Sequence, residues 1–194
     1  MFMLRRPTEV QVARRVEEAR RSRPRIAVLM SIDGQGPDVD VRVGFAHDRT
    51  ESRLGEGTDI FDKAKRAFAE WVHFDLGWVR VANPDARIAV GAIVAVEVRS
   101  LGLWSLNLSR IVETVDTKER FGFVYSTTEM HLEQGEERFL VRFDAASGGV
   151  CYELEALSKP WSLLATMGYP VTRAFQHRFA RDSHRRMAEA VRNA

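Results

Sequence analysis

The densest group of side chains that could do chemistry is a short polar run in the second half of the chain. It contains the imidazole of His131 and the carboxylates of Glu133, Glu136 and Glu137. These groups can exchange protons with a substrate, and they also suit hard or borderline metal ions. The spacing matches no helical zinc motif, and Gly135 indicates a solvated turn whose carboxylates pair with arginines. We therefore expect no metal, and we keep His131 and Glu133 as candidate acid–base groups.

Arg110 is a further candidate, because it lies on a predicted strand directly before the apolar residues Ile111 and Val112. A guanidinium within a sheet must reach water or meet a carboxylate. If Arg110 faces a cavity, it can hold a carboxylate or phosphate group of a ligand through two parallel hydrogen bonds. An ion pair with a glutamate of the same sheet is the alternative, and the sequence leaves both open.

Large aromatic side chains are candidates to line a binding cavity. Trp78 and Trp104 lie on predicted strands, where alternate side chains face a core or a cavity. Packing in a core without any further function is the alternative. Cys151 alternates with apolar strand residues, so we expect a buried thiol rather than a nucleophile.

The composition of the chain places these groups in a globular protein. The 194 residues are 45% hydrophobic and 29% charged, which excludes disorder for most of the chain. No run approaches the ~18 uncharged apolar residues of a transmembrane helix. The N-terminus has no signal-peptide pattern, so we expect a cytoplasmic protein. The single cysteine excludes an intramolecular disulfide and a multi-cysteine zinc site.

Both ends of the chain are basic. Residues 1–25 carry a net charge of +5 and residues 173–194 a net charge of +4, so the remainder is acidic. Charge complementarity between the ends and the acidic body is the simplest explanation. A surface for phosphate, nucleic acid or anionic lipid is the alternative. The aromatic residues of the last helix face away from its arginines, so we expect no nucleic-acid binding.

Periodic elements must position these side chains. Helices are predicted at residues 8–21, at 59–75 with Thr58 as N-cap, and at 161–191 with an interruption. Alternating apolar residues predict strands at 39–46, 78–82, 90–99, 104–116, 121–125, 137–143 and 150–156. Tight turns between successive strands favour antiparallel pairing.

This order predicts an α+β fold with two parts. Residues 1–36 form a basic surface helix and loop. Residues 37–194 form one domain, in which a curved antiparallel sheet of about six to seven strands wraps on a long C-terminal helix.

Several short motifs occur in an order that resembles a known family. They are Phe61-Asp62-Lys63-Ala64, Leu76-Gly77-Trp78, Arg110-Ile111-Val112, Phe121-Gly122-Phe123-Val124-Tyr125, Gly135-Glu136-Glu137-Arg138-Phe139, Ser158-Lys159-Pro160 and the run from Gln176 to Ser183. The set resembles the bacterial and plant family called domain of unknown function 1990, or uncharacterised protein family 0548. That family belongs to the START-like (SRPBCC) helix-grip superfamily. The chain departs from the family pattern at Ser126 and Thr128, where Gly and Leu are usual.

The resemblance implies a cavity between the sheet and the last helix, and it leaves three functions open. The first is binding of an apolar or amphipathic small molecule, lipid-like or polyketide-like. The residues expected to line its site are Trp78, Trp104, Arg110, Phe123, Tyr125 and Phe175. The second is a small enzyme of cyclase or hydrolase type that uses the same cavity. Its candidate acid–base groups are Tyr125, His131 and Glu133.

The third function is an interaction module that uses the basic helices. We favour the binding protein over the enzyme. We expect no cofactor, a bacterial source, and a monomer or homodimer.

Overall fold

One antiparallel sheet dominates the structure, which is a computed structural model and describes residues 2–22, 30–34, 45–129, 131, 133–160 and 169–194. Within these residues, seven strands follow the order β2-β8-β7-β6-β5-β4-β3, and the short β1 pairs with β5. The strands are β1 (Phe2–Met3), β2 (Ala46–Glu56), β3 (Val79–Val81), β4 (Ile93–Ser100), β5 (Leu103–Asp116), β6 (Arg120–Thr127), β7 (Glu133–Phe143) and β8 (Gly149–Pro160). The helices are α1 (Glu9–Arg21), α2 (Thr58–Ala69), the 3₁₀ helix η2 (Val72–Phe74) and α4 (Tyr169–Asn193).

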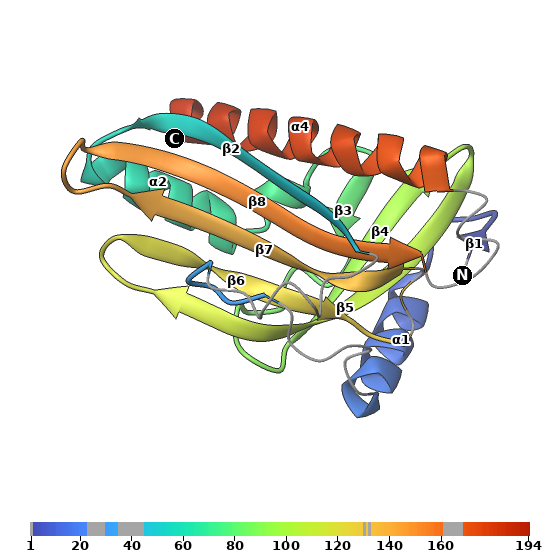
Figure 1. Ribbon diagram of the computed structural model, residues 1–194. Helices are drawn as coiled ribbons and strands as arrows, with labels where there is room; N and C mark the ends of the chain where they lie inside the picture. The colour runs from blue at the N-terminus through green and yellow to red at the C-terminus, as the bar shows by residue number, and fades with distance from the viewer. Residues whose placement is uncertain (1, 23–29, 35–44, 130, 132, 161–168) are drawn as a thin grey trace.

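The helices lie on both sides of the curled sheet. Figure 1 shows α4 running along the sheet beside β2, with α1 on the opposite side. Helix α4 contacts β2, β8, α2 and η2, whereas α1 contacts β4 and β5. The predicted class, a curved antiparallel sheet around a long C-terminal helix, is confirmed.

The main core lies between the inner face of the sheet and the helices α2, η2 and α4. An unusual member is His73, which is fully buried and stacks on Phe68 with ring centroids 4.2 Å apart. Neither ring nitrogen of His73 has a hydrogen-bond partner among the residues that the structure describes. Burial lowers the pKa of His73 to about 3, because the charged imidazolium would lose its hydration. The ring is therefore neutral at pH 7.

The outer face of β4 and β5 is covered by α1. Thr8 and Gln11 form a reciprocal capping box that starts this helix. Arg110 of β5 closes its other end, because one guanidinium nitrogen donates to the carbonyls of Ala19, Arg20 and Ser22, each at 3.0 Å. The carbonyl of Ala19 also accepts hydrogen bonds from the N–H and the hydroxyl of Ser22, at 3.1 and 2.8 Å. A cation is favourable at a helix C-terminus, where the last carbonyls lack the N–H donors of a following turn.

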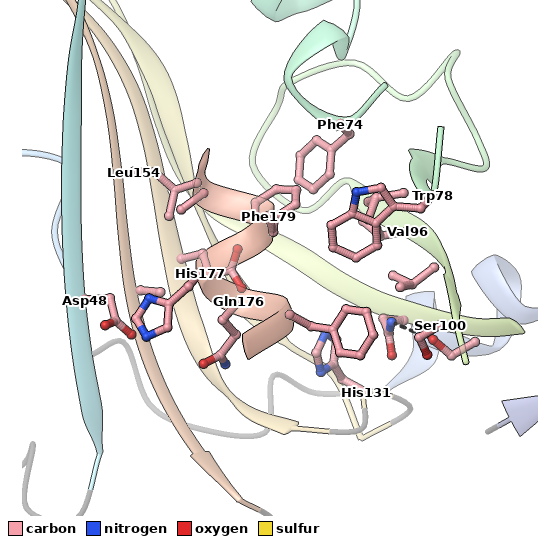
Figure 2. Close-up of a pocket in the computed structure, with 18 of the residues that line it drawn as sticks. Asp48, Phe74, Trp78, Val96, Ser100, His131, Leu154, Gln176, His177 and Phe179 are labelled. Atoms are coloured by element: carbon pink, nitrogen blue, oxygen red, sulfur yellow. Dashed lines mark hydrogen bonds between the residues drawn. The ribbon is translucent and has the colours of Figure 1, made fainter. Parts of the chain in front are cut away.

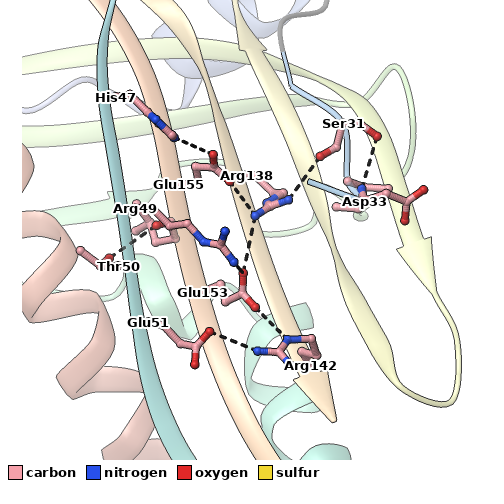
Figure 3. Close-up of polar contacts among 12 residues, drawn as sticks. Ser31, Asp33, His47, Arg49, Thr50, Glu51, Arg138, Arg142, Glu153 and Glu155 are labelled. Carbon is pink, nitrogen blue, oxygen red and sulfur yellow. Dashed lines mark hydrogen bonds and ion pairs between the residues drawn. The ribbon is translucent and has the colours of Figure 1, made fainter. Parts of the chain in front are cut away.

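A network of ion pairs covers the outer face of β2, β8 and β7 (Figure 3). Its centre is Arg138, which is 3% exposed and lies 2.6 Å from Glu155 and 3.5 Å from Glu153. Glu153 also accepts hydrogen bonds from Arg49 and Arg142, at 3.0 and 2.9 Å. Burial alone would raise the pKa of Glu153, but the arginines outweigh it and hold the pKa below its ordinary value.

Three predictions around α2 and β7 are wrong. The helix predicted at 59–75 ends at Ala69, because Trp71 adopts a left-handed conformation (φ 62°) before the 3₁₀ turn. Its N-cap is Gly57, not Thr58. Gly135 lies within β7 opposite Ser158 rather than in a turn. Most of the strand predicted at 39–46 falls on residues 35–44, which lie outside the described residues.

Candidate functional site

A cavity of about 230 Å³ lies between the inner face of the sheet and α4. Its aromatic and aliphatic walls come from η2, β3, β4 and α4, and include Phe74, Trp78, Val96, Val98, Phe175 and Phe179. Figure 2 shows Phe74 and Trp78 on one side of this space, with Asp48 and His177 on the β2 side. The cavity therefore presents an aromatic wall opposite a polar one.

Trp78 is fixed by contacts to α4. Its indole N–H donates to Oδ2 of Asp182 at 3.1 Å, and the guanidinium of Arg178 lies 4.4 Å from the ring centroid. The ring of Phe175 lies 5.7 Å from the same indole. Burial would raise the pKa of Asp182, but hydrogen bonds from Trp78 and Arg178 lower it overall, so the carboxylate stays charged. These contacts hold the aromatic wall in one orientation.

Tyr125 and Glu137 form a hydrogen-bonded pair at the cavity. They are direct cross-strand neighbours on β6 and β7, and the tyrosine hydroxyl donates to Oε2 of Glu137 at 2.8 Å. His131, in the connection between these strands, also lines the cavity (Figure 2). A phenol, a carboxylate and an imidazole thus reach the same space.

Asn107 of β5 adds a polar group that the sequence analysis did not select. It lines the cavity, and its side-chain amide donates to Oγ of Ser105 at 3.3 Å. Its carbonyl oxygen Oδ1 is buried and has no hydrogen-bond partner within the described part of the chain. A buried acceptor without a partner is costly, so a small rotation of the amide that turns Oδ1 towards a ligand hydroxyl or N–H in the cavity would be stabilised.

The polar wall joins β2 to α4. Arg173 donates to both carboxylate oxygens of Asp48, one of them at 2.6 Å, and this hydrogen bonding lowers the pKa of Asp48. Further along the contact between β2 and α4, the imidazole of His184 contacts the hydroxyls of Ser52 and Thr50 at 2.7 and 2.8 Å. Burial lowers the pKa of His184, which favours its neutral form. Thr50 also lines the cavity.

The structure brings together four of the candidate residues: Trp78, Tyr125, His131 and Phe175 all line the cavity. Phe123 does not line the cavity. Its side chain is fully buried in the core, with its ring 5.1 Å from that of Phe139. Glu133 begins β7 opposite Pro160, but its side chain lies outside the described ones.

Trp104 and Arg110 lie on the opposite face of the sheet from the cavity. The guanidinium groups of Arg6 and Arg99 lie 5.7 and 5.8 Å from the ring centroid of Trp104. Arg110 caps α1, as described above, so it does not line the cavity, and its guanidinium has no carboxylate partner in the described part of the chain. Both placements differ from the expected cavity lining.

The sheet, the long helix and the cavity between them define a helix-grip protein. The fold is similar to the Zhui aromatase/cyclase of Streptomyces sp. R1128, with a TM-score of 0.54 at 12% identity over 76% of this chain and 94% of that chain. It is also similar to the aromatase/cyclase BexL, with a TM-score of 0.53 at 15% identity over 76% of this chain and 50% of that chain. At such low identity these likenesses concern the fold alone.

The family is more specific than the fold. The family described as a domain of unknown function, DUF1990, matches residues 33–186, and the chain belongs to it. A UPF0548 protein of Deinococcus radiodurans is 36% identical over 98% of this chain and 99% of its own length. A UPF0548 protein of Dictyostelium discoideum is 32% identical over 98% and 96%. No described helix is long and apolar enough to cross a membrane.

Proposed function

We propose that this protein binds a small amphipathic molecule in the cavity between the sheet and α4. The observation that carries the proposal is the combination of an aromatic wall with the unpartnered carbonyl oxygen of Asn107. Ligand sites in proteins are mostly apolar with a few placed polar groups, and this cavity has that composition. The ligand places an apolar face on Trp78 and Phe175 and donates a hydrogen bond to Asn107.

The size of the cavity restricts the ligand. A volume of about 230 Å³ corresponds to about eight water molecules at liquid density. It lies just below the range of ~300–1,000 Å³ that is usual for drug-sized ligands. We therefore propose a compound of one or two rings, or the end group of a longer lipid-like or polyketide-like molecule.

The test combines native mass spectrometry with a cavity-filling variant. The purified protein is examined without added ligand, and compounds of one or two rings with a hydroxyl group are then titrated by calorimetry. Val98→Phe places a ring in the cavity and should abolish binding, whereas Val90→Phe, at a 65% exposed position, should bind like the parent chain. Equal binding by both variants would contradict the proposal.

Acid–base catalysis in the same cavity is a second candidate. The hydrogen-bonded pair of Tyr125 and Glu137, with His131 on the same lining, favours it. Any compound that binds should be incubated with the parent chain and with Glu137→Gln, and its mass and absorption followed. A change that Glu137→Gln removes, while binding persists, would support an enzyme. An unchanged compound would leave binding as the function.

A further inference from the structure

Two strongly exposed leucines lie at one end of the sheet. Leu4 follows β1 and is 85% exposed, and Leu101 is at the tip of the β4–β5 hairpin and is 82% exposed. Met3 pairs with Trp104, and Ser100 with Leu103, so the register brings both segments to the first residues of β5. Figure 1 shows β1 and this hairpin at the same end of the molecule.

The backbone conformation at Leu101 is unfavourable for a leucine. The hairpin loop has two residues, and both have positive φ angles, 51° at Leu101 and 79° at Gly102. Asn-Gly is the favoured pair in such a turn, because a left-handed conformation is unfavourable for a branched apolar residue. With most of its surface exposed, Leu101 gains little from packing. A strained and exposed leucine therefore requires another explanation.

The charges around the leucines are positive. Arg6 and Arg99 both lie within cation–π distance of the ring of Trp104, and the carboxylate of Glu97 is paired with Arg6 and Arg80. Arg5 and Arg99 have no ion-pair partner among the described residues. The surface thus combines protruding aliphatic groups, a tryptophan and uncompensated arginines.

We propose that this surface, formed by Leu4, Arg5, Arg99, Leu101 and Trp104 and here called the hairpin-end surface, binds anionic lipid membranes. The leucines enter the boundary between headgroups and acyl chains, where protruding apolar residues of peripheral proteins are stabilised. Tryptophan is favourable at the level of the headgroups, and the arginines bind lipid phosphates. The occupant is a lipid surface rather than a protein groove, because the leucines protrude singly and are surrounded by cations.

The hairpin also reaches the cavity. Ser100 and Ser105, on its two strands, both line it. A membrane bound at the hairpin-end surface would lie beside the space that the proposed ligand occupies. Membrane binding itself requires no ligand, so it can fail or succeed independently of the proposed function.

The test is co-sedimentation of the full chain with vesicles of phosphatidylcholine, with and without phosphatidylserine. We expect binding that requires phosphatidylserine and weakens as salt is raised. Leu101→Asn should weaken binding roughly tenfold, as expected for loss of a partly buried leucine. The same variant should unfold at an equal or higher urea concentration, because asparagine suits the turn. Loss of binding cannot then be attributed to misfolding.

Matched controls remove an exposed valine elsewhere. Val10→Asn on α1 (79% exposed) and Val90→Asn (65% exposed) should bind vesicles like the parent chain. Arg99→Gln should lower binding to the anionic vesicles and reduce its salt dependence. Equal binding to both kinds of vesicle, unaltered binding by Leu101→Asn, or an equal loss in Val10→Asn would overturn the proposal. The last result would place the contact on the basic helix α1 instead.

Discussion

Acidification should destabilise this protein through His73. The pKa of this imidazole is about 3 in the folded chain, against 6.5 for the free group. Between these values the unfolded chain binds a proton that the folded chain does not. The stability that neutral His73 supplies is therefore complete above pH 6.5 and is lost progressively as pH falls towards 3.

The size of the effect follows from the difference in pKa. Each pH unit below 6.5 lowers the free energy of unfolding by about 1.4 kcal/mol. The total loss is about 2.7 kcal/mol at about pH 4.5. The side chain is fully buried, so solvent screening does not reduce this figure. A loss of this size is a large part of the stability of an ordinary domain.

The assay is urea unfolding from about pH 8 to about pH 4.5 for the parent chain and for His73→Phe. A phenyl ring can keep the stacking on Phe68 but cannot bind a proton. His184, whose pKa is also lowered, remains in both proteins, so its contribution cancels in the difference. The difference in stability between the two should be constant above pH 7 and change by about 2.7 kcal/mol at the acid end.

If the difference in unfolding free energy between the parent chain and His73→Phe stays constant over the whole pH range, this reasoning is refuted. It would mean that the folded protein accommodates the imidazolium, through a water molecule or through opening of the aromatic cluster. His73→Leu is a second variant, because it removes the proton-binding site without adding a larger ring. Both variants should reduce the loss of unfolding free energy at acid pH by the same amount, whatever they do to the stability at neutral pH.

Two further predictions concern the elements around the site. Arg110→Met should remove three hydrogen bonds to the end of α1 and cost about 1–2 kcal/mol, seen as faster amide exchange in α1 with ligand binding unchanged. Exchange that stays slow would show that apolar packing alone holds the helix. Gly135→Ala would place a Cβ 2.2 Å from the carbonyl oxygen of Leu157, and should lower the free energy of unfolding by about 1–3 kcal/mol. An alanine variant with unchanged thermal stability would contradict this close approach of β7 and β8.

The strands from β4 to β8 were predictable because one face of each is apolar at period two. β2 was missed, because polar side chains occupy both of its faces. His47 and Arg49 pair with glutamates on the outer face, and Asp48 and Thr50 contact α4 on the inner face. A strand stabilised by ion pairs and hydroxyl contacts carries no hydrophobic period for sequence analysis to detect.

The candidate site was only half predictable for a related reason. The first half of β5 is covered on both faces, by the core on one side and by α1 on the other. Periodicity shows that Trp104 and Ser105 face opposite ways, but not which of them faces the cavity. The sequence analysis chose Trp104, while Ser105 and Asn107 lie on the inner face. Long-range packing, which places α1, decides the question.

The pairing of β2 with β8 also sets an order on folding. Thr50 pairs with Leu154, so about a hundred residues separate the two strands in the chain. During synthesis β2 therefore leaves the ribosome long before its partner exists. An apolar strand whose two edges are unpaired is prone to aggregation, whereas the charged side chains of β2 remain hydrated. Closure of the sheet, and with it of the cavity under α4, is then a late step of folding.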